Sequence, residues 1–396
     1  MRRHLRLTTA AATIAVALTA TACATPGGDP ASAPTDDAAS VAPEGGRVAV
    51  AYEGGIVVLE AATLEELAEI DSEEFIRLNP WGDGRTVVVT TSEGFHLLDT
   101  AEPALTDLVF EADAAGHVVA HHGTTVLFDD GTGVSTIVDT DAFADGYASL
   151  PRTAAHTADE PHHGVSVVLD DGTLLTTIPD RSGAVALHPH NDHYDEHASS
   201  SDCPGLHGEG TAADEAVVFG CENGALLYHD GEFVKLDAPD EYGRMGNAYV
   251  SETSPLIVGD YKSDPDADGY LLSSVALIDT EAETFEVVDL PNGVQYTWRG
   301  IARGPGELAY VLSTDGQIHV LDPKTGALTD AYPVIGAWEG PSEWQNPHPA
   351  IKVDGDIAYV TEPATDSVHA VDLTTGEVVA SVELHHTPNE IAIALG

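Results

Sequence analysis

TVVVTTSEGFHLLD, residues 86–99, is the clearest copy of a phrase that recurs along this chain. An apolar run is followed by a turn that ends near glycine, and a second apolar run then ends in an acid. Short β-branched runs separated by such turns indicate antiparallel β-hairpins. Eight copies are present, and their terminal acids are Glu60, Asp99, Asp139, Asp180, Asp230, Asp279, Asp322 and Asp372.

Successive terminal acids are 39 to 50 residues apart. A period of this size with several strands per repeat is typical of a β-propeller, in which neighbouring blades bury the faces of each sheet. We therefore predict an all-β fold, a single β-propeller with eight blades. Seven blades with one irregular unit are the alternative, because residues 115–188 are hard to divide.

The two ends of the repeat region complement each other. The first unit lacks an inner strand before Arg47, and a surplus apolar strand at 389–395 follows the last unit. A ring that is closed in this way leaves no exposed strand edge. We expect this C-terminal strand to pair into the first blade and close the propeller.

Composition limits the classes of function. The chain has 396 residues, with 15 Lys+Arg against 66 Asp+Glu and a formal charge of −51, and 43% of its residues are hydrophobic. The apolar content supplies a large core, whereas the negative charge repels phosphate and anionic lipid. We predict no nucleic-acid partner and no membrane contact other than a lipid anchor, and the charge is compatible with cation binding.

The N-terminus resembles a bacterial export signal with a lipobox, because three arginines precede an apolar segment that ends in Ala-Thr-Ala-Cys23. We predict a lipoprotein signal peptide at 1–22, a lipidated Cys23 followed by a flexible acidic, Pro-, Gly- and Ala-containing linker to residue 46, and the propeller domain at 47–396. The alternative is a plain secretory signal with an incidental cysteine. Either signal places the domain outside the cytoplasm, and we expect a cell-surface or periplasmic lipoprotein.

Two further cysteines, Cys203 and Cys221, remain for the folded domain. Exported proteins fold in an oxidising compartment, which favours a disulfide between them. A two-thiolate metal site is the alternative.

Histidine is unusually concentrated. Eleven of the 19 histidines lie between residues 117 and 207, and the densest segment is HPHNDHYDEH at 188–197, which we interpret as a loop between two blades. Imidazoles with neighbouring carboxylates are typical ligands of Zn²⁺, and four histidines within ten residues can surround one ion. The alternative is a solvated acidic loop, which we favour for the separate pair His162 and His163.

The repeat alignment adds a second indication of a metal site. It places His156 and His207 at the starts of innermost strands in neighbouring blades, where they could share an ion, and leaves His348 for a separate contact. The predicted Zn²⁺ ligands are His156, His188, His190, His193, His197, His207, Asp195 and Glu209.

The segment Cys203-Pro-Gly-Leu-His207-Gly-Glu209, the following Gly220-Cys221-Glu-Asn-Gly224 and the upstream His/Asp segment resemble the AztD family of zinc metallochaperones. The resemblance covers most of the chain from residue 47 to residue 395. It implies an extracytoplasmic zinc-binding propeller that delivers Zn²⁺ to the solute-binding protein of a zinc ABC transporter and is not an enzyme. The linker lacks the histidines found in related chaperones, so a labile zinc site there is not expected.

The motifs of common enzymes are missing from the sequence. It contains no G-x-S-x-G, no P-loop and no H-E-x-x-H, so no complete catalytic group of residues can be identified. We therefore predict a non-enzyme and expect a monomer. The alternatives are a propeller enzyme, either lactonase-like or a metal-assisted hydrolase, and a protein-interaction scaffold that binds no metal.

Overall fold

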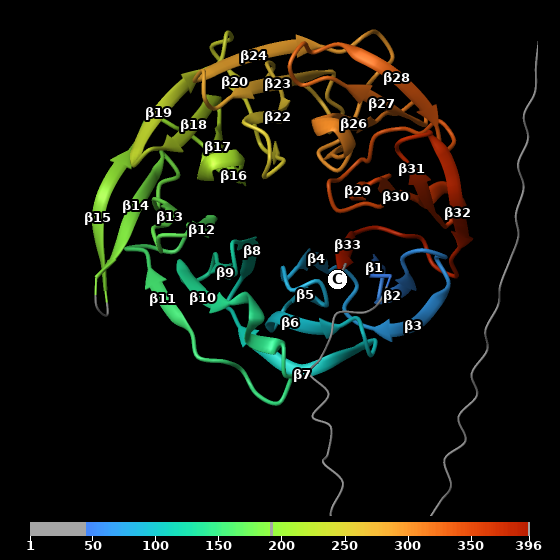
Figure 1. The fold of residues 1–396 in the computed structure, drawn as a ribbon, viewed down its shortest axis with the longest axis horizontal. Coiled ribbons are helices and arrows are strands. Elements are labelled where there is room, and N and C mark those ends of the chain that lie inside the picture. Colours follow the sequence, from blue (N-terminus) through green and yellow to red (C-terminus); the bar gives the residue numbers. More distant parts are fainter. Residues whose placement is uncertain (1–44, 191–192, 395–396) are drawn as a thin grey trace, which may run out of the picture. The chain divides into compact units, whose positions relative to one another are not determined.

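The computed structural model describes residues 45–190 and 193–394. They form eight antiparallel sheets that are arranged as blades around a ring (Figure 1), and the predicted eight-bladed propeller is confirmed. The described residues contain no α-helix and four short 3₁₀ turns: η1 (Thr140–Phe143), η2 (Ala213–Glu215), η3 (Pro305–Glu307) and η4 (Pro363–Thr365). The predicted signal peptide, the lipidation at Cys23 and nearly all of the predicted linker lie outside the described residues.

Each blade has four strands that follow one another from the centre of the ring outward. Blades one to four consist of β33 (Ile391–Ala394), β1 (Arg47–Tyr52), β2 (Gly55–Glu60) and β3 (Glu66–Asp71); β4 (Arg77–Pro80), β5 (Thr86–Thr91), β6 (Gly94–Asp99) and β7 (Ala104–Glu111); β8 (Ala115–His121), β9 (Thr124–Asp129), β10 (Val134–Asp139) and β11 (Ala154–Thr157); and β12 (Ser166–Val168), β13 (Leu174–Thr177), β14 (Ala184–His190) and β15 (His193–Ser200).

The other half of the ring repeats this order, and blade five carries one short extra strand that pairs with its third strand. Blades five to eight consist of β16 (His207–Thr211), β17 (Val217–Cys221), β18 (Asn223–His229), β19 (Glu232–Asp237) and the extra β20 (Gly243–Arg244); β21 (Ala248–Tyr249), β22 (Leu256–Tyr261), β23 (Ser274–Asp279) and β24 (Thr284–Asp289); β25 (Ile301–Arg303), β26 (Ala309–Leu312), β27 (Gln317–Leu321) and β28 (Leu328–Pro333); and β29 (Ile351–Asp354), β30 (Ile357–Glu362), β31 (Ser367–Asp372) and β32 (Glu377–Glu383).

The C-terminal strand closes the ring. β33 pairs antiparallel with β1, and Ala394 lies opposite Arg47 while Ile391 lies opposite Val50. Two backbone hydrogen bonds extend the pairing, from Ala51 N to Glu390 O and from Asn389 N to Ala51 O. The predicted closure is therefore confirmed, and the first blade is built from both ends of the domain.

The hydrophobic core is divided into eight clusters, one at each interface between neighbouring blades. The cluster between blades three and four has the fewest buried residues: Val126, Val168, Leu174 and Leu187. Polar contacts complete this interface, including hydrogen bonds of 2.8 Å between Ser135 Oγ and Ser166 Oγ and of 2.6 Å from Ser166 Oγ to Thr176 Oγ1. The more polar interface lies beside the histidines described below.

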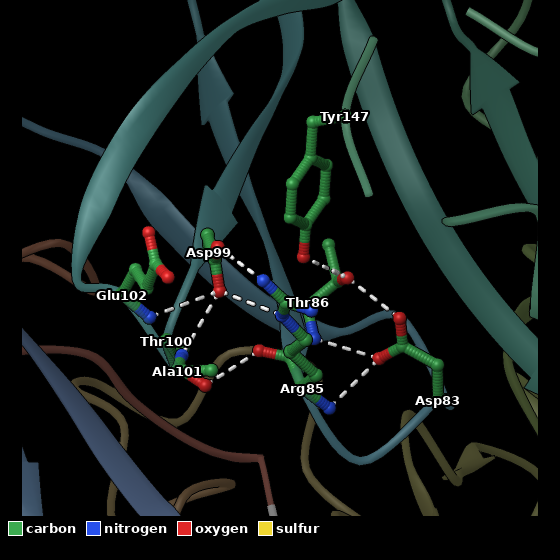
Figure 2. A network of polar contacts seen from close by, with 8 residues as sticks. All are labelled: Asp83, Arg85, Thr86, Asp99, Thr100, Ala101, Glu102 and Tyr147. Atoms are coloured by element: carbon green, nitrogen blue, oxygen red, sulfur yellow. Dashed lines mark hydrogen bonds and ion pairs between the residues drawn. The ribbon is translucent and has the colours of Figure 1, made fainter. Parts of the chain in front are cut away.

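The recurring acids have a structural role. Figure 2 shows Asp99 at the end of β6, where its Oδ1 accepts hydrogen bonds from the backbone N–H groups of Ala101 and Glu102 and its carboxylate forms an ion pair with Arg85 at 2.6 Å. Aspartate stabilises turns by accepting the N–H groups that follow it. Five acids accept backbone N–H groups in the same way in other blades: Asp139, Asp180, Asp279, Asp322 and Asp372. The repeated acid therefore caps a turn.

The sequence was divided wrongly in blade four. We assigned the phrase at 166–180 to the middle strands of a blade, but it forms the first and second strands, β12 and β13. The segment 188–197 is consequently not a loop between blades. It lies on the hairpin of the two outer strands, β14 and β15. The error arose because β12 has the apolar pattern of a middle strand, and because β14 ends in His190 where most third strands end in an acid.

Candidate metal centre

Three histidines from three successive blades converge at the centre of the ring. His117 is the third residue of β8, His163 lies three residues before β12, and His207 is the first residue of β16. These are the innermost strands of their blades. One ring nitrogen from each histidine lies within 4.8 Å of the others, and the ring centroids are 4.9 to 5.5 Å apart.

The scaffold orients all three imidazoles in the same manner. His117 Nδ1 lies 2.9 Å and His207 Nδ1 2.7 Å from a backbone carbonyl oxygen, and His163 Nδ1 lies 2.6 Å from Asp130 Oδ2. Carbonyl and carboxylate oxygens only accept hydrogen bonds, so each Nδ1 donates its proton. Each Nε2 is then left with a free lone pair, which is how metal-binding histidines are held in proteins.

Burial keeps two of these rings neutral. Desolvation, together with the nearby His207 and His163 rings, lowers the pKa of His117 to about 3. Desolvation likewise lowers the pKa of His207 to about 4. Since a metal ion binds only the unprotonated nitrogen, both rings are ready to bind at neutral pH.

The three histidines open into a cavity of about 950 Å³. Aromatic side chains, among them Trp298 and Trp344, form part of its wall. His163 is the outermost of the three ligands, with 41% of its side chain exposed. An ion at this position is therefore accessible from one side.

The spacing of the three rings suits Zn²⁺ after a small contraction. Tetrahedral Zn²⁺ with Zn–N bonds of about 2.0–2.1 Å places its ligand nitrogens roughly 3.4 Å apart. Separations of up to 4.8 Å can close to this value by small side-chain rotations. Three protein ligands leave the fourth position open toward the cavity for an exchangeable ligand.

A second group of ligands lies at the other ends of the same inner strands. His121 ends β8, Glu215 ends η2 after β16, and Asp170 follows β12. His121 Nε2 lies 3.1 Å from Glu215 Oε1, and His122 Nδ1 lies 3.5 Å from Glu215 Oε1 and 2.9 Å from Asp170 Oδ1. These are hydrogen-bond and ion-pair distances, and one ligand atom from each of His121, His122 and Glu215 lies within 4.8 Å of the others, so these three side chains could hold an ion.

The predicted histidine segment forms two contacts on the outer hairpin of blade four. His190 Nδ1 lies 2.8 Å from Asp195 Oδ2 and His193 Nε2 lies 3.3 Å from Asp195 Oδ1, with more than half of each side chain exposed. The rings of His188 and His197 lie 4.3 Å apart. The structure therefore brings these five residues together as two neighbouring groups at the surface.

The expected pairing of His156 with His207 is wrong. His156 lies on β11, the outermost strand of blade three, where its ring meets the edge of the Tyr194 ring at 5.9 Å. Its assignment to an innermost strand followed from the wrong division of blade four. Glu209 lies on β16 but outside the three-histidine group, and desolvation raises the pKa of its carboxyl group to about 7.

Cys203 and Cys221 form a disulfide, as predicted, with their Cα atoms 4.9 Å apart. It ties the segment that precedes His207 to the end of β17. The same segment is held by a hydrogen bond from Cys203 N to Ser182 O and by the guanidinium of Arg181, which donates to Leu206 O. The disulfide therefore helps to fix the position of His207.

His117 and His163 were not among the ligands predicted from the sequence. The available signal was the position of His207 at the start of an inner strand. A correct division of blade four would have placed His163 just before the inner strand of the neighbouring blade. The prediction that His163 lies in a solvated loop was instead based on its local sequence.

No family model matches the chain. It is 25% identical over 203 residues to the zinc chaperone AztD of Citrobacter koseri, over 49% of this chain and 45% of that protein. The chain thus spans about half the length of the curated relative that it matches. Within the described residues, no helix is long and apolar enough to cross a membrane.

Solved structures share the fold. The structure of apo AztD from Citrobacter koseri has a TM-score of 0.72 and 21% identity, covering 88% of this chain and 97% of that one. The dihydro-heme d1 dehydrogenase NirN has a TM-score of 0.63 and 13% identity, covering 89% and 76%. The resemblance of this chain to the AztD zinc chaperones, predicted from its Cys-Pro-Gly-Leu-His-Gly-Glu segment, is thereby confirmed.

Proposed function

We propose that the protein is an extracytoplasmic zinc chaperone that delivers Zn²⁺ to the solute-binding protein of a zinc ABC transporter. The observation that carries this proposal is the convergence of His117, His163 and His207, each with its Nδ1 anchored and its Nε2 free. The relative named a zinc chaperone supports the identity of the cargo.

The acidic side chains that line the cavity already have hydrogen-bond partners, which favours a zinc carrier over an enzyme. A metal-assisted hydrolase needs a free base to activate water. Among the described residues that line the cavity, Asp130 contacts His163, Asp260 accepts three hydrogen bonds from Gly246 and Asn247, and Glu73 contacts Ser92. We therefore propose a binding function without catalysis.

Transfer is proposed to proceed by stepwise ligand exchange. A ligand from the receiving protein enters through the cavity and occupies the open fourth position. It then displaces His163, the most exposed ligand, before the more buried His117 and His207 release the ion. This order lets zinc move between proteins without passing through bulk water.

A second zinc site is proposed at His121, His122, Glu215 and Asp170. Four donor side chains can complete a tetrahedron without an outside ligand, as in structural zinc sites. This group is therefore suited to retaining its ion, whereas the three-histidine site is suited to passing it on.

The outer hairpin is proposed as a weaker capture surface. His188, His190, His193 and His197 are exposed or only partly buried, and the Nδ1 of His188 is hydrogen-bonded to Thr173 Oγ1 at 2.8 Å. The charge of −51 raises the local concentration of cations around the chain. His156 and Glu209 have no role in this proposal.

The cellular setting is proposed from the sequence. An export signal at 1–22 carries the domain out of the cytoplasm, and lipidation at Cys23 anchors it to the membrane. We propose that the anchored protein is a monomer. The anchor holds the chaperone near the membrane-bound transporter that its partner serves.

The test is a transfer experiment with the zinc-loaded full chain and the zinc-free solute-binding protein, in the presence of excess chelator. We expect the partner to gain zinc faster than zinc dissociates into the chelator alone. A His190→Ala, His193→Ala variant serves as a matched control and should transfer normally. Equal rates with and without the partner would refute the proposed chaperone function.

A further inference from the structure

The cavity beside the three-histidine site is much larger than zinc requires. Six water molecules around one ion need about 180 Å³, at roughly 30 Å³ for each water, whereas the cavity has about 950 Å³. Cavities of this size commonly hold organic ligands of several hundred daltons. The volume therefore suggests that the ion does not enter alone.

One wall of the cavity suits an organic molecule. The guanidinium of Arg77 lies 5.2 Å from the ring centroid of Trp298 and 5.7 Å from that of Trp344, and Phe75 packs edge-on against Trp344 at 5.5 Å. The aromatic rings present flat apolar surface beside the hydrogen-bond donors of the Arg77 guanidinium. A hydrated ion has no use for such a surface.

The cavity also holds an unexpected number of cations. Arg77, Arg244 and Lys262 line it, in a chain that has only 15 Lys+Arg against 66 Asp+Glu. Three acids, Glu73, Asp130 and Asp260, line the same cavity, but their carboxylates already have scaffold partners. The cations therefore favour a ligand that brings negative charge of its own along with the metal.

The acidic and basic side chains of the cavity differ in how many of their polar atoms already have partners in the protein. Its acids contact the scaffold, as described above. Among the described residues, Arg244 and Lys262 form no ion pair: the guanidinium donates to Gly205 O at 3.3 Å, and the ammonium group donates to Ala267 O at 3.1 Å. Both cations retain donors for a ligand, and carboxylates are natural partners for them.

We propose that the cavity binds Zn²⁺ as a complex with a small carboxylate-bearing chelator. The three imidazoles hold the ion, and one carboxylate of the chelator fills the fourth position. Its other carboxylates meet Arg244 and Lys262, while its body lies against Trp298 and Trp344. This inference rests on the proposed zinc-binding function and names the form in which the cargo arrives.

The experiment is equilibrium dialysis of the full chain, with and without Zn²⁺, against radiolabelled citrate, malate and ethylenediamine-disuccinate as probes. We expect the zinc-loaded chain to retain about one molecule of at least one probe, and the zinc-free chain to retain much less. The Arg244→Gln and Lys262→Gln variants should each retain the probe about tenfold less tightly. Their affinity for zinc alone should rise, because a repelling charge has been removed.

Arg152→Gln, at an exposed arginine outside the cavity lining, is the matched control and should behave like wild type. Zinc binding without retention of any probe overturns this inference and leaves the zinc site standing. Equal retention of the probe by Arg244→Gln and wild type also overturns it. So does a result in which only the receiving protein, and no probe, occupies the cavity. Failure to bind zinc at all refutes the proposed function itself.

Discussion

The three-histidine site and the outer hairpin of blade four both present imidazoles and carboxylates, yet they differ in construction. His190, His193 and Asp195 lie within six residues of one another, and more than half of each side chain is exposed. His117, His163 and His207 are each more than 40 residues apart, and the scaffold holds every ring through its Nδ1 atom. A high density of histidines along the chain is therefore a separate property from the preorganisation of their rings in the fold.

The difference has a thermodynamic consequence. Exposed side chains on a hairpin must lose rotamer freedom when they bind an ion, which weakens binding. The inner histidines have already lost that freedom when the propeller folds. We therefore expect tight binding at the inner site and weak binding at the hairpin.

The strongest test of this contrast is His207→Ala. Removal of one of three ligands should weaken zinc binding at the inner site by at least about 100-fold, because even loss of a supporting group costs about 10- to 100-fold. Titration of the full chain against a competing chelator measures the loss. His156→Ala, at a predicted ligand that lies on an outer strand, is the control. Equal affinity for His207→Ala and wild type would contradict the proposed site.

Glu215→Gln distinguishes the proposed zinc site at one end of the inner strands from the three-histidine site at the other end. We expect the number of tightly bound zinc ions to fall from two to one, because the carboxylate that joins His121 and His122 becomes a neutral amide. Metal analysis after gel filtration gives the count. The adjacent exposed Asp214 provides the control Asp214→Asn, which should keep both ions. A count of two in Glu215→Gln would rule out the second site.

Asp130→Asn tests whether orientation of the rings matters. Asp130 accepts the Nδ1 proton of His163 at 2.6 Å. The amide accepts this proton more weakly, so zinc affinity should fall about 10- to 100-fold while the fold persists. Chelator competition and thermal unfolding separate the two effects. Asp107→Asn, at an exposed residue of β7, should change neither, and an unaltered affinity in Asp130→Asn would show that this contact is dispensable.

Acidification tests the burial of the inner rings. The pKa of His117 falls from about 6.5 in the unfolded chain to about 3 in the fold. Between these values the unfolded chain binds the proton first, so the free energy of unfolding decreases as pH falls, by up to about 1.4 kcal/mol per pH unit. Urea unfolding of zinc-free wild type and His117→Gln at pH 7 and pH 5 should show the smaller drop in the variant. His190→Gln should retain the wild-type drop, and identical drops for all three proteins would count against burial of His117.

The smallest effect is expected on the hairpin. Replacement of His188, His190, His193 and His197 with alanine should change the affinity of the tight sites by less than about threefold, since none of these rings belongs to the three-histidine group or to the group around Glu215. The same chelator titration measures it. A loss comparable with that of His207→Ala would reverse the comparison and restore the hairpin as the principal site.

Much of the architecture followed from local patterns. The alternation of apolar runs with glycine turns reports strands wherever they occur, and the surplus strand at 389–395 could pair only where an inner strand was missing. Cys203 and Cys221 were predictable as a pair because the predicted export would place them in an oxidising compartment. These features follow either from the local sequence around each residue or from the redox state of the compartment in which the protein is predicted to fold.

The metal centre depended on contacts that no local pattern reports. His117, His163 and His207 meet because three inner strands bring their starts together, and the direction of each ring is set by a hydrogen bond to a neighbouring blade. A shift of one strand in dividing blade four was enough to move the predicted ligand from His163 to His156. Repeats reveal which strands exist, but the chemistry arises from strand ends that meet only after the ring has closed.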